Sequence, residues 1–501
     1  MVWRGFACFV FVLLLWSCAW GADVEPPNVV VSWRPSKVVN DKIYEIKVKV
    51  EAKDDKSPIS HAELHFIPEE YEYFITEYGM RPEDYGRVFP PEGERVFVLT
   101  PSDGRFDELE EGFSTVIDDI VGGREYRIVV IVEDSAGNKG IAELETPYIR
   151  QFENLGKELY EKGIIVAAVY LPFDMSEIPR KDDDPLLGRY DAMDYIVEWK
   201  HIDWATGHGI NVFLIDSQNH WWPEIKNRVI RVFSNISNTG QVKVAWMMGP
   251  SPRHFVYGKY GEEIPEWAID LSISKNKETF VSFAKELLKP EFVTKESYMK
   301  VDGKPVLYIW DEGAFFNQKE TYQSIKQFTK EMYGNDLYII ADWIPPIPTS
   351  PMDEYVRFLL GKYRGEGLKV VDAFTGWIGF HQVGLDTEQY VKNYNQFYET
   401  QLRRWRTFTQ ICGKNFIVTV VPGFDGSYCW GREPQIPLPR GKERFRERLA
   451  IGVKYIDKSI PWIKIDTWND WGEWSYMEPT VNEGFSYLKV LKETLMNLND
   501  A

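Results

Sequence analysis

Eight short apolar runs recur between residues 163 and 468, and a stretch with the periodicity of an amphipathic helix follows each of them. Runs without alternation are typical of strands that are buried on both faces of a parallel sheet. The runs occupy residues 163–170, 210–216, 242–248, 305–310, 337–343, 370–377, 416–422 and 462–468. The helical stretches occupy residues 191–208, 223–236, 276–289, 319–333, 352–363, 386–410, 441–458 and 484–498.

This order of strands and helices predicts a (β/α)8 TIM barrel over residues 151–501. An open, doubly wound α/β sheet is the competing arrangement. It is disfavoured because no Gly-rich phosphate-binding loop follows any of the runs.

Residues 22–150 have a different pattern of apolar residues, which predicts an all-β domain. Apolar side chains alternate with charged ones at positions 44–50 and again at positions 126–132, which is the pattern of strands with one exposed face. The segment EDSAGNKG supplies the residues of a hairpin turn. We expect a sandwich of immunoglobulin or fibronectin-III type. A Tyr-rich, acidic insertion at residues 66–94 is expected to form a surface loop or a flap over a neighbouring site.

The first 21 residues read as a signal peptide, with one Arg before an apolar stretch and small residues near Gly21. We therefore expect a secreted or cell-surface protein. An uncleaved anchor, or a lipid attached at Cys18, would be the only route to a membrane, because no later stretch is long and apolar enough to span a bilayer.

Composition limits the classes of partner and cofactor. The formal net charge of -18 argues against a nucleic-acid partner, which needs a basic surface. Beyond the signal peptide, only Cys412 and Cys429 remain, and export permits a disulfide between them without requiring it. The seven His are scattered, so neither a metal nor another cofactor is expected. Many Glu and Lys residues would also suit a heat-stable protein.

In a barrel of this type, the loops after the strands build the active site. Almost every such loop here carries a Trp, a carboxylate or both, although each residue taken singly could be packing or a helix cap. An acidic, aromatic cleft suits carbohydrate, because sugar faces stack on aromatic rings and carboxylates bind hydroxyls. The candidate substrate-binding residues are Tyr170, Asp216, His220, Trp221, Trp310, Asp311, Glu312, Trp343, Trp377, Asp425, Trp471, Trp474 and Glu478.

Asp470 and Glu473 follow the last strand and are the candidate catalytic pair. Glycosidic cleavage needs a proton donor and a second carboxylate across the scissile bond. Mutual repulsion, together with desolvation by Trp471 and Trp474, would raise the pKa of one of the two, as an acid requires. The alternative is a capped start of the last helix with acids on the surface.

The stretch TWNDWGEWSYMEPTVNEGFSYL at residues 467–488 resembles the strand-8 signature of glycoside hydrolase family 99 and of the related WbsX-type proteins. Their pattern is roughly N-E-W-x-E-G, a short apolar segment, E-P and G-x-x-Y-L. The matching residues are Asn469, Trp471, Glu473, Glu478, Pro479, Gly484, Tyr487 and Leu488. AAVYLPF, residues 190–216, DGKPVLYIW and VVPGFD agree in order, so the resemblance covers most of residues 163–498.

The resemblance implies a (β/α)8 fold and a retaining endo-α-mannosidase or related endo-α-glycosidase that uses no metal and acts on an oligosaccharide or polysaccharide. Carried over by position, Glu473 is the acid/base and Asp470 is the partner that deprotonates the substrate's 2-hydroxyl. Two positions depart from the pattern. Asp470 is one methylene shorter than the usual Glu, and Trp474 stands where relatives have Gly.

Two alternatives remain open at this point. A retaining β-glycosidase could use the carboxylates after strands 4 and 7, with Glu312 as acid and Asp425 as nucleophile. A non-catalytic glycan-binding protein of the cell envelope would keep the aromatic cleft but not the chemistry.

Overall fold

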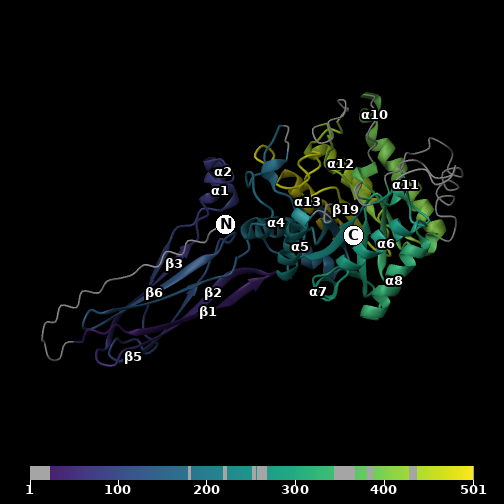
Figure 1. The fold of residues 1–501 in the computed structure, drawn as a ribbon. Helices are drawn as coiled ribbons and strands as arrows, with labels where there is room; N and C mark the ends of the chain where they lie inside the picture. The colour runs from purple at the N-terminus through teal and green to yellow at the C-terminus, as the bar shows by residue number, and fades with distance from the viewer. Residues whose placement is uncertain are drawn as a thin grey trace.

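The computed structural model describes residues 23–178, 182–217, 223–250, 255–256, 268–343, 367–380, 388–427 and 437–499. Two antiparallel sheets form an elongated N-terminal unit, and a parallel barrel surrounded by helices follows it (Figure 1). The predicted signal peptide lies outside the described residues. Among the described helices, none combines the length and apolarity that crossing a bilayer demands.

The parallel sheet closes into a ring. Its strands are β8 (Ile165–Tyr170), β9 (Val212–Asp216), β10 (Lys243–Met248), β13 (Lys304–Ile309), β15 (Tyr338–Trp343), β16 (Ala373–Gly376), β17 (Asn415–Phe416), β18 (Val418–Val420) and β19 (Trp462–Ile465). β17 pairs with β16 and β18 pairs with β19, so these two segments are one strand interrupted at Ile417. β19 also pairs with β8, which completes a barrel in which every neighbouring pair is parallel. The eight predicted strands are confirmed.

Helices cover the outside of this barrel (Figure 1). They are α3 (Leu155–Glu161), α4 (Tyr195–Gly207), α5 (Pro223–Asn238), α6 (Ser274–Leu287), α7 (Pro290–Val293), α8 (Lys319–Tyr333), α10 (Glu388–Lys392), α11 (Tyr394–Cys412), α12 (Lys442–Val453) and α13 (Ser486–Asn499). The predicted helix at 352–363 lies outside the described residues. Short elements β11 (Ile269–Asp270) and β14 (Phe315–Phe316) pair beside the barrel, and β12 (Lys300–Val301) forms a hairpin with β13. Cys412, at the end of α11, is a free thiol, whereas Cys429 lies outside the described residues.

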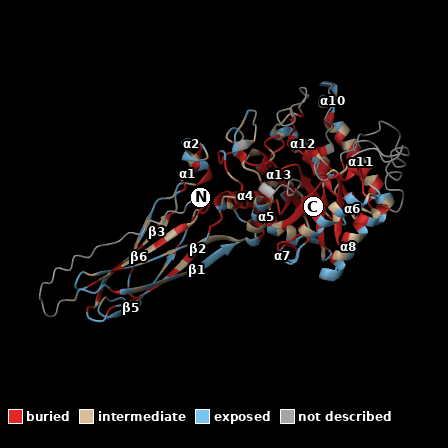
Figure 2. Cartoon of the chain, in the orientation of Figure 1, coloured by how far each residue is buried: buried red, intermediate tan, exposed pale blue. Residues whose placement is uncertain are grey.

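The barrel strands consist largely of buried residues (Figure 2), and apolar side chains pack the barrel interior. Val169, Leu214, Met247, Val306 and Ile340 from five different strands belong to one buried cluster there. Side chains of this kind fill a barrel of eight strands completely, so it has no pore. The apolar runs are therefore buried on both faces, which explains why they show no alternation.

The N-terminal unit consists of a three-stranded and a four-stranded antiparallel sheet that share one core. The first sheet contains β1 (Asn28–Val39), β2 (Lys42–Lys53) and β5 (Glu110–Ile117), and the second contains β4 (Arg95–Val98), β3 (Ile59–Pro68), β6 (Tyr126–Asp134) and β7 (Lys139–Glu145). The predicted hairpin joins β6 to β7, and Asp134 Oδ1 accepts the N–H groups of Ala136 and Asn138 in its turn. Assignment to the immunoglobulin or fibronectin-III class stays a prediction.

The Tyr-rich insertion lies against the barrel. It contains α1 (Tyr73–Thr76) and α2 (Pro82–Val88). The hydroxyls of Tyr73 and Tyr78 donate to Asp194, the N-cap of α4, and the buried Lys200 of α4 donates to Val88 O at 2.5 Å. Burial lowers the pKa of Lys200 to about 7. The insertion, predicted as a surface loop or flap, thus joins the two units by buried polar contacts.

Candidate functional site

The loop that follows β19 is fastened to the first strand of the barrel by the buried amide of Asn469. Its Oδ1 accepts the N–H of Leu171 at 2.8 Å, and its Nδ2 donates to the carbonyl of the same residue at 2.9 Å. Trp468 N–H donates to Val169 O at 2.7 Å. An amide side chain suits this place because its oxygen and its nitrogen can accept and donate side by side, as the N–H and the carbonyl of one residue require, which accounts for the Asn of the motif.

Glu478 lies at the centre of a buried polar network beneath this loop. Its Oε2 accepts from the Tyr190 hydroxyl at 2.7 Å and from Trp471 Nε1 at 2.9 Å, and its Oε1 lies 3.1 Å from His201 Nε2. The Tyr170 hydroxyl lies 3.0 Å from His201 Nδ1 and so extends the network to β8.

Tyr170, Trp471 and Glu478 are predicted to line the substrate site; the structure buries them, with exposed fractions of 0%, 2% and 1%, and that role stays a prediction. Their polar atoms are used by one another, so these residues support the loop from below. Sequence reasoning did not assign roles to Tyr190 and His201. The one available signal was the H-I pair in the helix after the first strand.

Asp470 and Glu473 lie on a tight turn at the carboxyl end of β19. Asp470 Oδ1 accepts the backbone N–H of Glu473 at 2.9 Å, and Asp470 N–H donates to Thr467 Oγ1 at 2.8 Å. Burial raises the pKa of Asp470 to about 6, while hydrogen bonds from the backbone of Glu473 and Gly472 act in the opposite direction. The shift falls on Asp470, the expected partner of the acid/base Glu473, with desolvation as the leading cause.

Trp474 follows Glu473 with a φ of 58°, in the left-handed region that favours glycine. Glycine, which the motif pattern predicts at this position, adopts this conformation without strain. Arg440 supports the turn from outside, because its Nη1 donates to the carbonyls of Trp474 at 3.3 Å and Tyr476 at 2.9 Å. Its guanidinium also lies 3.9 Å from the centre of the Tyr476 ring.

Two half-buried tryptophans cap the barrel interior at the same end. Trp310 follows β13 and Trp377 follows β16, and their rings meet edge to face with centroids 5.9 Å apart. Both pack on the interior apolar cluster. They are the predicted aromatic residues that the structure brings together at the mouth.

A buried charge cluster that sequence reasoning missed lies beneath Trp377. Lys464 Nζ lies 4.9 Å from that ring, 2.7 Å from Asp466 Oδ1 and 3.3 Å from Asp342 Oδ2. It also donates to Tyr308 Oη at 2.8 Å and to Gly376 O at 2.6 Å. Burial raises the pKa of Asp342 to about 6, and Lys464 opposes that shift. The signal was present in WIKIDTW, where a Lys and an Asp interrupt an apolar run.

The carboxylates after strands 4 and 7 are enclosed. Glu312 is fully buried, and its Oε1 accepts from Gln318 Nε2 and from the Tyr322 hydroxyl, each at 3.2 Å. Asp425 is 3% exposed, and its Oδ1 accepts the N–H and the hydroxyl of Ser427. Asp425 N–H also donates to Glu473 O at 2.8 Å, so this residue holds the turn that carries Asp470 and Glu473.

The remaining candidates are placed as follows. Asp216 ends β9 and is buried opposite Met247 of β10. Asp311 follows β13 with a φ of 47°. Trp343 is buried, with its ring 5.5 Å from that of Trp405, so it belongs to the packing outside the barrel mouth. His220 and Trp221 lie outside the described residues.

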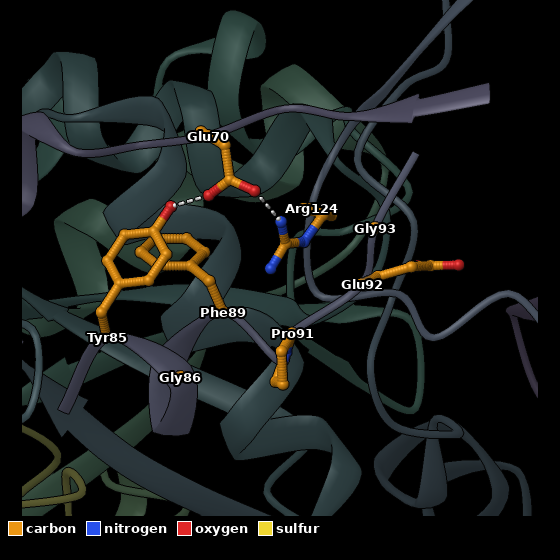
Figure 3. Close-up of a pocket in the computed structure, with 8 residues that line it drawn as sticks. All are labelled: Glu70, Tyr85, Gly86, Phe89, Pro91, Glu92, Gly93 and Arg124. Atoms are coloured by element: carbon orange, nitrogen blue, oxygen red, sulfur yellow. Dashed lines mark hydrogen bonds and ion pairs between the residues drawn. The ribbon is translucent and has the colours of Figure 1, made fainter. Parts of the chain in front are cut away.

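Two hollows in the described part of the chain contain no predicted site residue. One, of about 400 Å³, lies on the insertion (Figure 3). Glu70 bridges the Tyr85 hydroxyl and Arg124 Nη1 there, at 2.6 and 3.1 Å. The other, of about 390 Å³, lies between the insertion and the loops after β8 and β19, and includes Arg81, Asp183 and Asn482.

The geometry can be compared with known proteins. The profile of the family described as "Glycosyltransferase WbsX" matches residues 177–491. The chain belongs to the WbsX family. The resemblance of the strand-8 motif to WbsX-type proteins is therefore confirmed, and the matched range includes the loop after β19.

Solved structures with similarity to this WbsX-family chain are distant. A "glycoside hydrolase-like protein" is 20% identical, covers 66% of this chain and 93% of its own, and has a TM-score of 0.49. The GH99 endo-alpha-mannosidase from Bacteroides thetaiotaomicron is 13% identical, covers 67% of this chain and 97% of its own, and has a TM-score of 0.45. The same enzyme in complex with bis-tris-propane has a TM-score of 0.44 with the same identity and coverage. No curated protein matches the chain.

Proposed function

We propose that this chain is a secreted, retaining endo-α-glycosidase that cleaves mannan-like or related glycan chains. The observation that carries the proposal is the turn after β19, which holds Asp470 and Glu473 at the end of the barrel where such enzymes have their active sites. The family assignment and the motif at residues 467–488 support the same reading.

In the proposed mechanism, Glu473 protonates the leaving oxygen and later deprotonates the attacking water. Asp470 uses Oδ1 to hold the N–H of Glu473, which fixes the spacing of the pair. Its other oxygen accepts the proton of the substrate's 2-hydroxyl, whose oxygen bonds to C1 as the glycosidic bond breaks. Asp470 returns that proton when water opens the resulting anhydro sugar. A pKa of about 6 suits this exchange, because such a group gains and loses a proton close to neutral pH.

Trp310 and Trp377 supply the aromatic surface on which a sugar ring stacks in this proposal. The buried Lys464 cluster does not touch substrate. It has a positioning role. Lys464 of β19 donates a hydrogen bond to the carbonyl of Gly376, the residue before Trp377, and so fixes the turn of Asp470 and Glu473 relative to that aromatic ring.

Transfer to a sugar hydroxyl is the second candidate function, because the family description names a glycosyltransferase. The two reactions share the carboxylate chemistry and differ in the acceptor. The alternative with Glu312 as the acid is weakened by the complete burial of that side chain.

The test is a product analysis with α- and β-linked polysaccharides, with and without an oligosaccharide acceptor. Hydrolysis releases reducing ends from an α-linked substrate, and Glu473→Gln abolishes the release while glycan binding persists. If mass spectrometry shows lengthened products, the reaction is transfer to a sugar hydroxyl rather than hydrolysis. Binding without any product, across a wide range of pH and temperature, would leave a glycan-binding protein instead.

A further inference from the structure

The tip of the N-terminal unit farthest from the barrel gathers carboxylates from separate segments. Carboxylate oxygens of Asp23, Asp54 and Asp55 all lie within 4.8 Å of one another. β2 ends and β3 begins at this tip, whereas the opposite end of β1 contacts the start of the barrel through a hydrogen bond from Asn154 N to Asn40 O (Figure 1). The cluster is thus remote from the candidate active site.

One member of the cluster has a buried oxygen without a partner. The side chain of Asp23 is only 5% exposed, and its Oδ2 has no hydrogen-bond partner in the part of the chain that the structure describes. Its Oδ1 accepts the N–H of Glu25 at 3.2 Å and lies 4.0 Å from Lys56 Nζ. The pKa of Asp23 lies below its usual range, with the Ser57 side chain as the largest cause and Lys56 as a further one, so the carboxylate is charged at neutral pH. A buried anionic oxygen in this state is costly unless a cation binds it.

The other two carboxylates are presented by a well-ordered turn. Asp54 is buried, and its Oδ1 accepts the N–H groups of Lys56 and Ser57, each at 2.8 Å. The N–H of Asp54 donates to the carbonyl of Leu109 at 2.8 Å, which holds the turn against the residue that precedes β5. Asn138 Nδ2 donates to Asp23 O at 3.3 Å and holds the start of the described chain in place. The ligands are therefore positioned before any ion arrives.

We propose that Asp23, Asp54 and Asp55 bind a calcium ion, which fastens the segment before β1 to the tip of the sandwich. Calcium takes six to eight oxygen ligands at about 2.3–2.6 Å, so two oxygens on one ion lie up to about 5 Å apart. The carboxylate oxygens, which all lie within 4.8 Å of one another, can share such an ion. Magnesium demands a stricter octahedron at about 2.0–2.1 Å, which carboxylates from separate segments meet less readily. Backbone carbonyls and water complete the sphere.

A second acidic group offers an internal control. Asp103, Asp107 and Glu108 also lie within 4.8 Å of one another, but all three are exposed. None of their oxygens is buried without a hydrogen bond among the described residues. We expect no specific ion there, because exposed carboxylates keep their water.

The experiment is a calcium titration of the full mature chain after treatment with EDTA, followed by calorimetry and thermal unfolding. We expect a dissociation constant of about 0.1–1 mM, as in other extracellular calcium modules, and an increase in Tm of several degrees. Asp54→Asn keeps the oxygen that accepts from Lys56 and Ser57 but removes the charge. It should abolish the heat signal and the Tm increase, and Asp23→Asn should do the same.

Three matched measurements make the outcome decisive. Asp103→Asn with Asp107→Asn should leave the calcium response intact, and calcium should not change glycan cleavage by the wild type. If Asp54→Asn fails to fold, the exposed Asp55→Asn replaces it and should weaken binding at least tenfold. The inference is overturned if the wild type shows no calcium-dependent Tm change, if the variants at Asp23 and Asp55 respond like the wild type, or if magnesium produces the same shift at equal concentration.

Discussion

The loops after β13 and β19 each carry acidic residues close together, yet the structure places these residues differently. Glu312 in the first loop points beneath α8 and accepts hydrogen bonds from Gln318 and Tyr322. Asp470 and Glu473 in the second loop lie on a turn. There, the backbone N–H of Glu473, rather than a side chain of a covering helix, donates a hydrogen bond to the Asp470 carboxylate. A carboxylate's role thus depends on what covers it, and its place after a barrel strand is not sufficient. Four measurements test this difference between the two loops.

The largest effect is expected from Glu473→Gln, which keeps the shape of the side chain but removes the acid. Loss of general acid–base catalysis should lower kcat/KM by about 10²–10⁴-fold. The matched change Glu312→Gln should leave kcat/KM within tenfold of the wild type. Steady-state kinetics on the polysaccharide identified in the screen would measure both. A larger loss from Glu312→Gln would reverse the assignment of the two loops.

Asp470→Asn should lower kcat by roughly 10²-fold, since the amide oxygen can still accept from Glu473 N–H but cannot take a proton. In the wild type, activity should rise with pH through about 6, because burial raises the pKa of Asp470 to that value and the base must be ionised. The variant should lose this acidic limb of the pH profile. A profile that keeps the limb unchanged would assign the titration to another group.

Glu312→Ala should reduce stability rather than catalysis. The change leaves the Gln318 amide and the Tyr322 hydroxyl buried without their acceptor, at a cost of about 1–3 kcal/mol in the free energy of unfolding. Denaturant unfolding measures this cost, and Glu473→Ala provides the comparison, with a smaller expected loss. Equal losses from both variants would remove the structural distinction between the loops.

The smallest effect concerns Trp474, whose φ of 58° strains any residue with a Cβ. Trp474→Gly and Trp474→Ala both remove the ring, but only Gly relaxes the backbone. The Gly variant should therefore be more stable than the Ala variant by about 1 kcal/mol. Thermal unfolding of the pair tests this. An Ala variant of equal or greater stability would mean that the turn adopts another conformation when the ring is absent.

The sequence alone determined the architecture of the barrel, because the eight apolar runs are long enough, and evenly enough separated by helical stretches, to specify parallel strands. It also determined the family, through the ordered residues around Glu473. Motif reasoning placed the catalytic candidates, which remain a prediction, on the loop after the last barrel strand, since the carboxyl ends of barrel strands share one face.

Which candidates reach the face at the carboxyl ends of the strands depends on contacts that form only in the folded chain. Tyr170, Trp471 and Glu478 belong to a buried network because Tyr190 and His201, which come from a distant segment, fill the space beside them. The same holds for Lys464, whose partners Asp342 and Tyr308 lie more than a hundred residues away along the chain. Local patterns carry information about periodicity and spacing, but burial and pairing of a polar side chain depend on neighbours that only the closed barrel brings into contact.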